Sequence, residues 1–198
     1  MELGYIALWW ASLELVGILA LPLTMRLFRR LPDGGYAFSK VLGLLLAGYG
    51  LWLGASFHII DNSAAGIWAV LVVLGLVSFY LWRREGSRLR RRLRAELPTI
   101  AFYEGLFLFS FLGYCTFRAY DPAIYGTEKP MDFAFLNAIL RSRTFPPHDP
   151  WLSGYAISYY YFGYLMAALL AKLSGVPAAW AYNLALGSTF ALTALGTT

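Results

Sequence analysis

The sequence predicts an all-α polytopic transmembrane protein with about six spans and a short amphipathic surface helix in one outer loop. Composition is the first observation behind this prediction: 59% of the 198 residues are hydrophobic, only 14% are charged, and the mean hydropathy is +0.57. A soluble domain carries about 25% charged residues. The second observation is that long apolar runs alternate with short basic links, which is typical of membrane topology signals. Both observations favour lipid as the solvent of this chain.

Six apolar stretches are long enough, or nearly long enough, to cross a bilayer, which takes about 20 residues. Each is predicted to be helical, because lipid cannot satisfy the polar groups of an open backbone. Glu2 stands where a cleavable signal peptide would have basic residues, so the first stretch is predicted to stay in the protein. Cys115 lies inside an apolar run and is interpreted as a small buried residue. The stretches cover residues 5–25, 38–57, 64–82, 98–117, 157–173 and 178–198.

Lysine and arginine residues set the predicted orientation. Arginines gather in the links RLFRRLPDGG and RREGSRLRRRLR, after the first and third stretches, and Lys172 follows the fifth. All of these lie on one side if the stretches alternate, and the positive-inside rule makes that side cytoplasmic. The N-terminus, the link 58–63 and the long link 118–156 are then outside. This predicts a multi-pass protein of the cell membrane.

The net charge of +5 does not indicate nucleic acid as a partner, because the basic residues are confined to these links between spans. The simpler interpretation is that these basic residues only orient the spans, and the alternative is that they also bind anionic lipid head groups.

The basic link after the third stretch marks the clearest boundary between two parts of the chain. Residues 1–97 are predicted to form a leading three-span unit, and residues 98–198 to begin a second membrane core. The last stretch, STFALTALGTT, has no basic stop, so the chain is predicted to be the N-terminal part of a longer protein with further C-terminal spans.

The outer link 118–156 holds the candidate chemistry. Within it, PMDFAFLNAILRS predicts a short helix, with Pro130 at its first positions and Asp132 in its first turn. Asp121, Glu128 and Asp132 are the candidate acids, and carboxylates at a membrane face can act as a general base or bind a divalent metal. The alternatives are a turn residue, a first-turn helix charge and a solvated side chain. Basic residues that could neutralise a phosphate are Arg118, Lys129, Arg141 and Arg143.

Two further features are candidates for function. Tyr159, Tyr160 and Tyr161 lie where the fifth stretch meets the outer interface, as an aromatic belt would. If they are helical they cannot all face lipid, so at least one is expected to face the protein or an outer cavity, where sugar rings could stack. Glu14 and Glu104 lie within spans, where an acid is a functional-site hypothesis. The alternative is a neutral glutamic acid hydrogen-bonded between helices.

Three segments carry a family resemblance: EKPMDFAFLNAILRS, FPPHDPWLSGYAISYYYFGY and YNLALGSTFALTALG. They resemble the large prokaryotic membrane proteins of the YYY family, or DUF2298, over roughly residues 98–198, while residues 1–97 fit less distinctively. That family is similar in plan to the GT-C glycosyltransferases, which take sugars from polyprenyl-phosphate donors. The analogy implies that Asp121 is the acid just after a span, and that Glu128 and Asp132 are the further acids. The adjacent Asp-Glu pair of many such enzymes is absent here.

The predicted function is therefore glycosyl transfer from a polyprenyl-phosphate-linked sugar at the extracytoplasmic face. Asp121 is expected to be the base, Glu128 and Asp132 to share a divalent metal ion (Mg²⁺ or Mn²⁺) or hold the acceptor, and Lys129 to meet the phosphate. Arg118, Arg141, Tyr159, Tyr160 and Tyr161 are the other expected substrate-binding residues. This segment alone is expected to be inactive without the remaining spans. The rival hypotheses are a transporter or channel component, with Glu14 and Glu104 lining a path, and a non-catalytic membrane scaffold.

Overall fold

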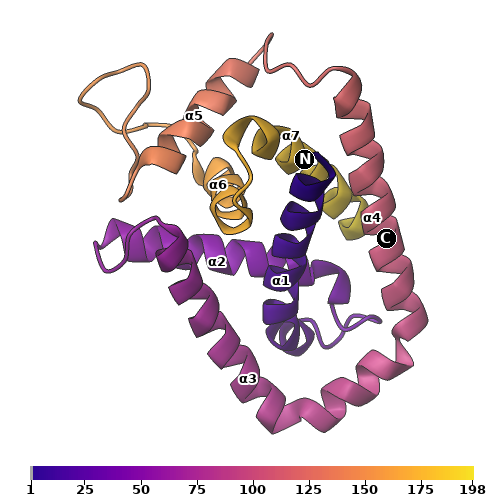
Figure 1. Ribbon diagram of the computed structural model, residues 1–198. Coiled ribbons are helices and arrows are strands. Elements are labelled where there is room, and N and C mark those ends of the chain that lie inside the picture. Colours follow the sequence, from indigo (N-terminus) through magenta and orange to yellow (C-terminus); the bar gives the residue numbers. More distant parts are fainter. Residues whose placement is uncertain (1) are drawn as a thin grey trace.

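The computed structural model describes residues 2–198, and within them every regular element is helical, so the all-α prediction is confirmed (Figure 1). The backbone makes one isolated bridge, between His148 and Ala156. The elements in chain order are α1 (Glu2–Leu27), η1 (Tyr36–Phe38), α2 (Ser39–Ser56), α3 (Ala64–Ala95), α4 (Leu97–Tyr120), α5 (Lys129–Arg141), α6 (Phe162–Ser174) and α7 (Ala178–Gly196).

Four helical segments in the described residues are long and apolar enough to cross a membrane, and a fifth arises if α6 and α7 together count as one broken span. This agrees roughly with the predicted six. The difference lies in the predicted span 157–173. Its helix begins only at Phe162 and has 13 residues, fewer than the roughly 20 that a span needs. A bend of 119° between α6 and α7 follows, so α6 is the short arm of a bent pair.

The basic link after the third stretch is helical, whereas the sequence pattern predicts only a connection between spans. α3 has 32 residues and is therefore about 48 Å long, well beyond the roughly 30 Å of a hydrocarbon core. The extension contains Leu89, which is buried and keeps the helical spacing of the buried Leu81. The arginines of this link are thus carried on a continuous helix.

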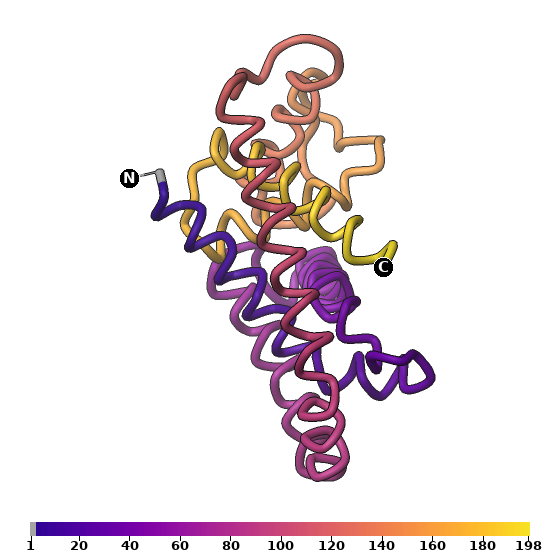
Figure 2. Tube along the Cα trace, turned by 90° about the vertical axis from the view of Figure 1, so that its right-hand side faces the viewer, coloured from indigo at the N-terminus to yellow at the C-terminus, as the bar shows by residue number. Residues whose placement is uncertain are grey.

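The two arginine-rich links lie together, as the alternation of spans predicts. Arg26 forms an ion pair with Glu85 of α3 at 2.7 Å, and Arg92 donates hydrogen bonds to the carbonyl oxygens of Arg29 and Leu31 at 2.9 and 2.5 Å. At the opposite end, the link 58–63 meets the long outer link. Figure 2 shows this separation, with the α3–α4 junction at the bottom and α5 with its loops at the top.

Asn62 is the residue that joins the outer elements. Its side-chain amide donates to the carbonyl oxygens of Ile139 and Ser142, at the end of α5, at 2.8 and 2.9 Å. Lys172 donates to the carbonyl oxygen of Asn62 at 2.5 Å. The placement of Lys172 on the same side as the arginines is therefore wrong. The bend between α6 and α7 is the physical reason, because α6 ends beside the link 58–63, at the end of the molecule opposite to the arginines.

The predicted surface helix is present as α5, which begins one residue before the predicted start at Pro130. Its buried side chains Phe135, Leu136 and Ile139 recur at helical spacing and pack on α6 and α7. α5 is therefore fixed against the bundle and covers its outer end.

The core is shared by helices from both sides of residue 97, and the predicted division at that residue stays a prediction. α1 and α2 pack most closely where two glycines meet the opposite helix. A Cβ atom at Gly43 would clash with the carbonyl oxygen of Val16, and one at Gly17 would lie 2.9 Å from Cγ of Lys40. Buried side chains of α1 and α2 belong to one apolar cluster that also takes in other helices. The cluster includes Trp9, Leu13, Leu51, Phe107, Phe111, Leu165 and Ala181.

Candidate functional site

Asp132 is the one predicted catalytic acid of the outer link whose carboxylate has side-chain hydrogen-bond partners within residues 2–198. It lies in the first turn of α5, where the helix dipole favours a negative charge. Its Oδ1 accepts a hydrogen bond from the hydroxyl of Tyr164 on α6 at 2.5 Å. Its Oδ2 has a longer contact of 3.4 Å with the hydroxyl of Tyr182 on α7. Three separate helices therefore meet at this carboxylate, and Oδ2 is the oxygen that retains accepting capacity.

An apolar groove of about 670 Å³ begins at this carboxylate. Side chains of α1, α2, α5, α6 and α7 line it, and most of them are aliphatic or small, such as Leu44, Met166, Ala185 and Leu192. Its polar residues include Asp132, Tyr164 and Tyr182. A ligand that fits this lining has a long apolar part and a polar group near Asp132.

Arg118, in the last turn of α4, is bound to the neighbour of Tyr182 on α7. It is 8% exposed, and its Nε and Nη2 atoms donate to Oδ1 of Asn183 at 2.9 and 2.7 Å. Asn183 directly follows Tyr182 on α7. Arg118 has no carboxylate within ion-pair distance among the described residues. The charge of this buried guanidinium is therefore met by a neutral amide and not by an acid.

The tyrosine triplet precedes α6 and is not helical, so the argument from helical spacing does not apply to it. One tyrosine does face inward: Tyr161 is half-buried and accepts a hydrogen bond from Nε1 of Trp52 at 2.9 Å. Tyr159 and Tyr160 are exposed and stacked, with ring centroids 3.9 Å apart. Tyr159 also packs on Phe135 of α5.

The hydroxyl of Tyr159 donates a hydrogen bond to that of Tyr160 at 2.6 Å. This bond, with a smaller contribution from desolvation, raises the pKa of Tyr159 to about 12. At neutral pH Tyr159 therefore remains a neutral hydroxyl. The pair offers aromatic faces and hydrogen bonds to a ligand, but no base.

The other predicted acids and bases of the outer link are not brought together. Asp121, Glu128 and Arg141 are exposed, and Lys129 is half-buried. None of the four forms an ion pair within residues 2–198. Their assigned roles stay predictions.

The described residues do not fit a divalent metal ion at this position. No group of three or more His, Cys, Asp or Glu side chains that could hold a metal occurs among residues 2–198. Both oxygens of Asp132 face hydroxyl donors rather than further acceptors, and Glu128 is exposed on its own. A requirement for Mg²⁺ or Mn²⁺ stays a prediction.

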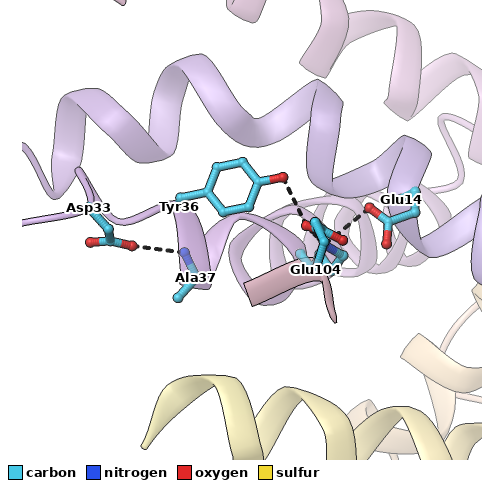
Figure 3. Close-up of polar contacts among 6 residues, drawn as sticks. Glu14, Asp33, Tyr36, Ala37 and Glu104 are labelled. Carbon is cyan, nitrogen blue, oxygen red and sulfur yellow. Dashed lines mark hydrogen bonds and ion pairs between the residues drawn. The ribbon is translucent and has the colours of Figure 1, made fainter. Parts of the chain in front are cut away.

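A second polar cluster lies inside the bundle and includes both intramembrane glutamates (Figure 3). Lys40, with only 3% of its side chain exposed, forms ion pairs with Glu14 at 3.1 Å and with Glu104 at 2.5 Å. The hydroxyl of Tyr36 donates to Glu104 at 2.8 Å, and the Lys40 ammonium lies 5.1 Å from the ring centre of Phe107. The helices α1, α2 and α4 thus meet through two ion pairs, and η1 joins them through the Tyr36 hydroxyl.

Sequence reasoning missed several of these partners. The role of Lys40 could have been predicted, because a lone lysine in an apolar stretch needs an acid partner and two acids occur in other spans. There were weaker grounds in the sequence for choosing Tyr182 and Asn183, which belong to the quoted segment YNLALGSTFALTALG. Nothing in the sequence singled out Tyr164 from its neighbouring tyrosines.

Comparison with known proteins now gives the chain a family. The family model described as "Uncharacterized membrane protein (DUF2298)" matches residues 46–197, which is most of the chain. The chain belongs to this family. The match begins within α2, so it extends well before Pro98, where the resemblance in the sequence begins. It includes α3 to α7, and with them Asp132, Tyr164 and Tyr182. No curated protein and no solved structure matches.

Proposed function

We propose that this DUF2298 protein transfers a sugar from a polyisoprenoid-phosphate donor to an acceptor hydroxyl at the outer membrane face, with Asp132 as general base. The observation that carries the proposal is the position of this carboxylate at the end of an apolar groove between membrane-spanning helices. The proposal assigns the base to Asp132 rather than to Asp121, because Asp121 is exposed and makes no side-chain hydrogen bond within the described residues.

The groove supports an isoprenoid chain as its occupant. Its walls include α2, α6 and α7, which are long apolar helices or parts of the bent pair that could cross a membrane. A polar metabolite would have to give up water to an aliphatic lining, at a free-energy cost for every unpaired polar group. A chain of isoprene units meets that lining without such a cost and brings its phosphate to the outer end.

The reaction balances as a single displacement. Asp132 Oδ2 takes the proton of the acceptor hydroxyl while the acceptor oxygen forms a bond to the anomeric carbon. The bond from that carbon to the phosphate oxygen breaks, and the phosphate leaves with the electron pair. Arg118 is the cation that would stabilise this phosphate. The hydrogen bond from Tyr164 to Oδ1 holds the carboxylate so that Oδ2 faces the acceptor.

The test is sugar transfer from radiolabelled polyprenyl-phosphate sugars in membranes that contain the full-length protein. Asp132→Asn should lower the rate on the order of 10²- to 10⁴-fold, because it removes the base while it keeps the shape. Asp121→Asn is the matched control and should stay near the wild-type rate. Tyr164→Phe should lower the rate less, since it removes only the group that orients Asp132.

Equal rates for Asp132→Asn and the wild-type protein would refute the proposal. The rival transport function predicts a different result, namely movement of the lipid-linked sugar across vesicles without any transfer product. The same vesicles therefore distinguish the two functions.

A further inference from the structure

Four arginines converge on one small pocket at the end of the molecule opposite to Asp132. The pocket measures about 90 Å³ and lies between the C-terminal end of α1 and the extension of α3. Arg26, Arg29, Arg88 and Arg92 line it, together with Glu85. Four positive charges and one negative charge give the lining a formal charge of +3. Like charges held this close repel one another, so an anion in the pocket would relieve the repulsion.

Two of these arginines form a fixed frame. Arg26 is held by Glu85 at 2.7 Å, and Arg92 by the backbone carbonyls of the α1–η1 link. The other two, Arg29 and Arg88, are exposed, and their side chains make no hydrogen bond or ion pair within residues 2–198. The pocket therefore has two arginines held in place by protein partners and two whose guanidinium groups are left free, among the described residues, to bind an anion.

Its position selects the ligand. The apolar part of α3 ends at Trp82, and the pocket begins about one turn beyond it, which is where lipid phosphates lie relative to a span. Guanidinium groups match phosphate oxygens in geometry and bind them in pairs. Basic pockets between transmembrane helices on the cytoplasmic side bind anionic head groups.

We infer that this arginine pocket is a binding site for the phosphate of an anionic phospholipid, held between α1 and α3. The inference is independent of the proposed sugar transfer. Arginines at this place also orient the spans in the membrane and complement the helix dipole at the end of α1. Neither of these two roles depends on which side of α3 an arginine occupies, and a lipid site does.

The experiment compares two variants that lose the same charge from the same region. In the pocket variant, Arg29→Gln and Arg88→Gln remove the two unpaired guanidinium groups. In the matched control, Arg83→Gln and Arg91→Gln remove two exposed arginines of α3 that do not line the pocket. The full-length proteins are purified in neutral detergent. Their thermal unfolding is measured against added phosphatidylglycerol, phosphatidylcholine or inorganic phosphate.

Phosphatidylglycerol should raise the unfolding temperature of the wild-type protein and of the control variant, and phosphatidylcholine should not. The pocket variant should bind phosphatidylglycerol about 30-fold more weakly than the control variant, because it alone loses two guanidinium contacts to the phosphate. Equal loss in both variants would overturn the inference in favour of non-specific attraction. Equal stabilisation by inorganic phosphate and by phosphatidylglycerol would overturn the lipid as the source of the phosphate.

Discussion

At the scale of single residues, Lys40 has the strongest predicted effect on stability. It is the one cation between two carboxylates, so Lys40→Met leaves both acids facing each other inside the bundle. Breaking a buried ion pair in this way costs about 3–5 kcal/mol. We expect a marked fall in the free energy of unfolding, measured by denaturant titration in detergent.

The control for Lys40 removes all three charges at once. Replacing both acids by glutamine in the Lys40→Met background leaves a neutral cluster of similar volume. Buried ion pairs can often be replaced by neutral groups with little loss, so most of the stability should return. A triple variant no more stable than Lys40→Met would mean that shape, and not charge, determines the effect.

Sequence reasoning was successful at this scale only where a residue's role depends on its own helix. It placed Asp132 in a first turn, and the structure has it there. The partners of Asp132 are 32 and 50 residues away in the chain, and they meet it only because α5 packs on α6 and α7. No local pattern specifies such a meeting. For Lys40 the sequence could indicate that an acid partner is needed, but not that two acids from other spans would meet it.

At the scale of elements, the crossing of α1 and α2 gives the clearest prediction. A methyl group at Gly43 would meet the backbone of Val16, which cannot move aside as a side chain can. Gly43→Ala should therefore destabilise the protein by roughly 1–3 kcal/mol, the cost of overpacking. Gly105→Ala on α4 is the control, because nothing lies within 4 Å of its Cβ position.

The control should move stability in the opposite direction. Alanine is the better helix former by about 1 kcal/mol, so Gly105→Ala is expected to be neutral or stabilising. The same denaturant titration compares the two variants. A loss of stability at both sites would show that the helices, and not their crossing, are sensitive to the change.

The lengths of the elements were predictable from apolar runs only in part. Apolar length identified α1, α2 and α4 nearly as observed. It failed for α3, where leucines at helical spacing continue the helix through an arginine-rich segment. It failed again for α6, where apolar residues are buried against neighbouring helices rather than used to cross the membrane.

At the scale of the whole molecule, the structure and the alternation of spans give different topologies for one segment. Trp180 at the start of α7 packs on Tyr5, near the N-terminus that is predicted to be outside, and Lys172 binds the outer link. We therefore expect Ala179→Cys to be labelled from outside by an impermeant maleimide in intact cells, with Cys115 first replaced.

Two further cysteines calibrate this experiment. Ser153→Cys should be labelled and Arg88→Cys should not. Ser153 belongs to the outer link and Arg88 to the arginine-rich extension of α3, and these two segments lie at opposite ends of the molecule (Figure 2). If Ser153→Cys is labelled and Ala179→Cys is not, the link before α7 lies on the same side of the membrane as the arginines, as the alternation of spans predicts. Labelling of Arg88→Cys alone would reverse the orientation of the entire chain.

Because α3 is one continuous helix, the position of each arginine in the sequence determines the direction in which its side chain points around the helix axis. A single residue inserted after Gly86 would turn everything beyond it by about 100° and shift it by about 1.5 Å. Ser87 would then take the place of Arg88, and Arg91 that of Arg92. The number of arginines on this side of the membrane would be unchanged, so the topology signal would survive. The arginine pocket would not, because orientation depends only on how many charges a segment carries, whereas the pocket depends on the direction in which each one points.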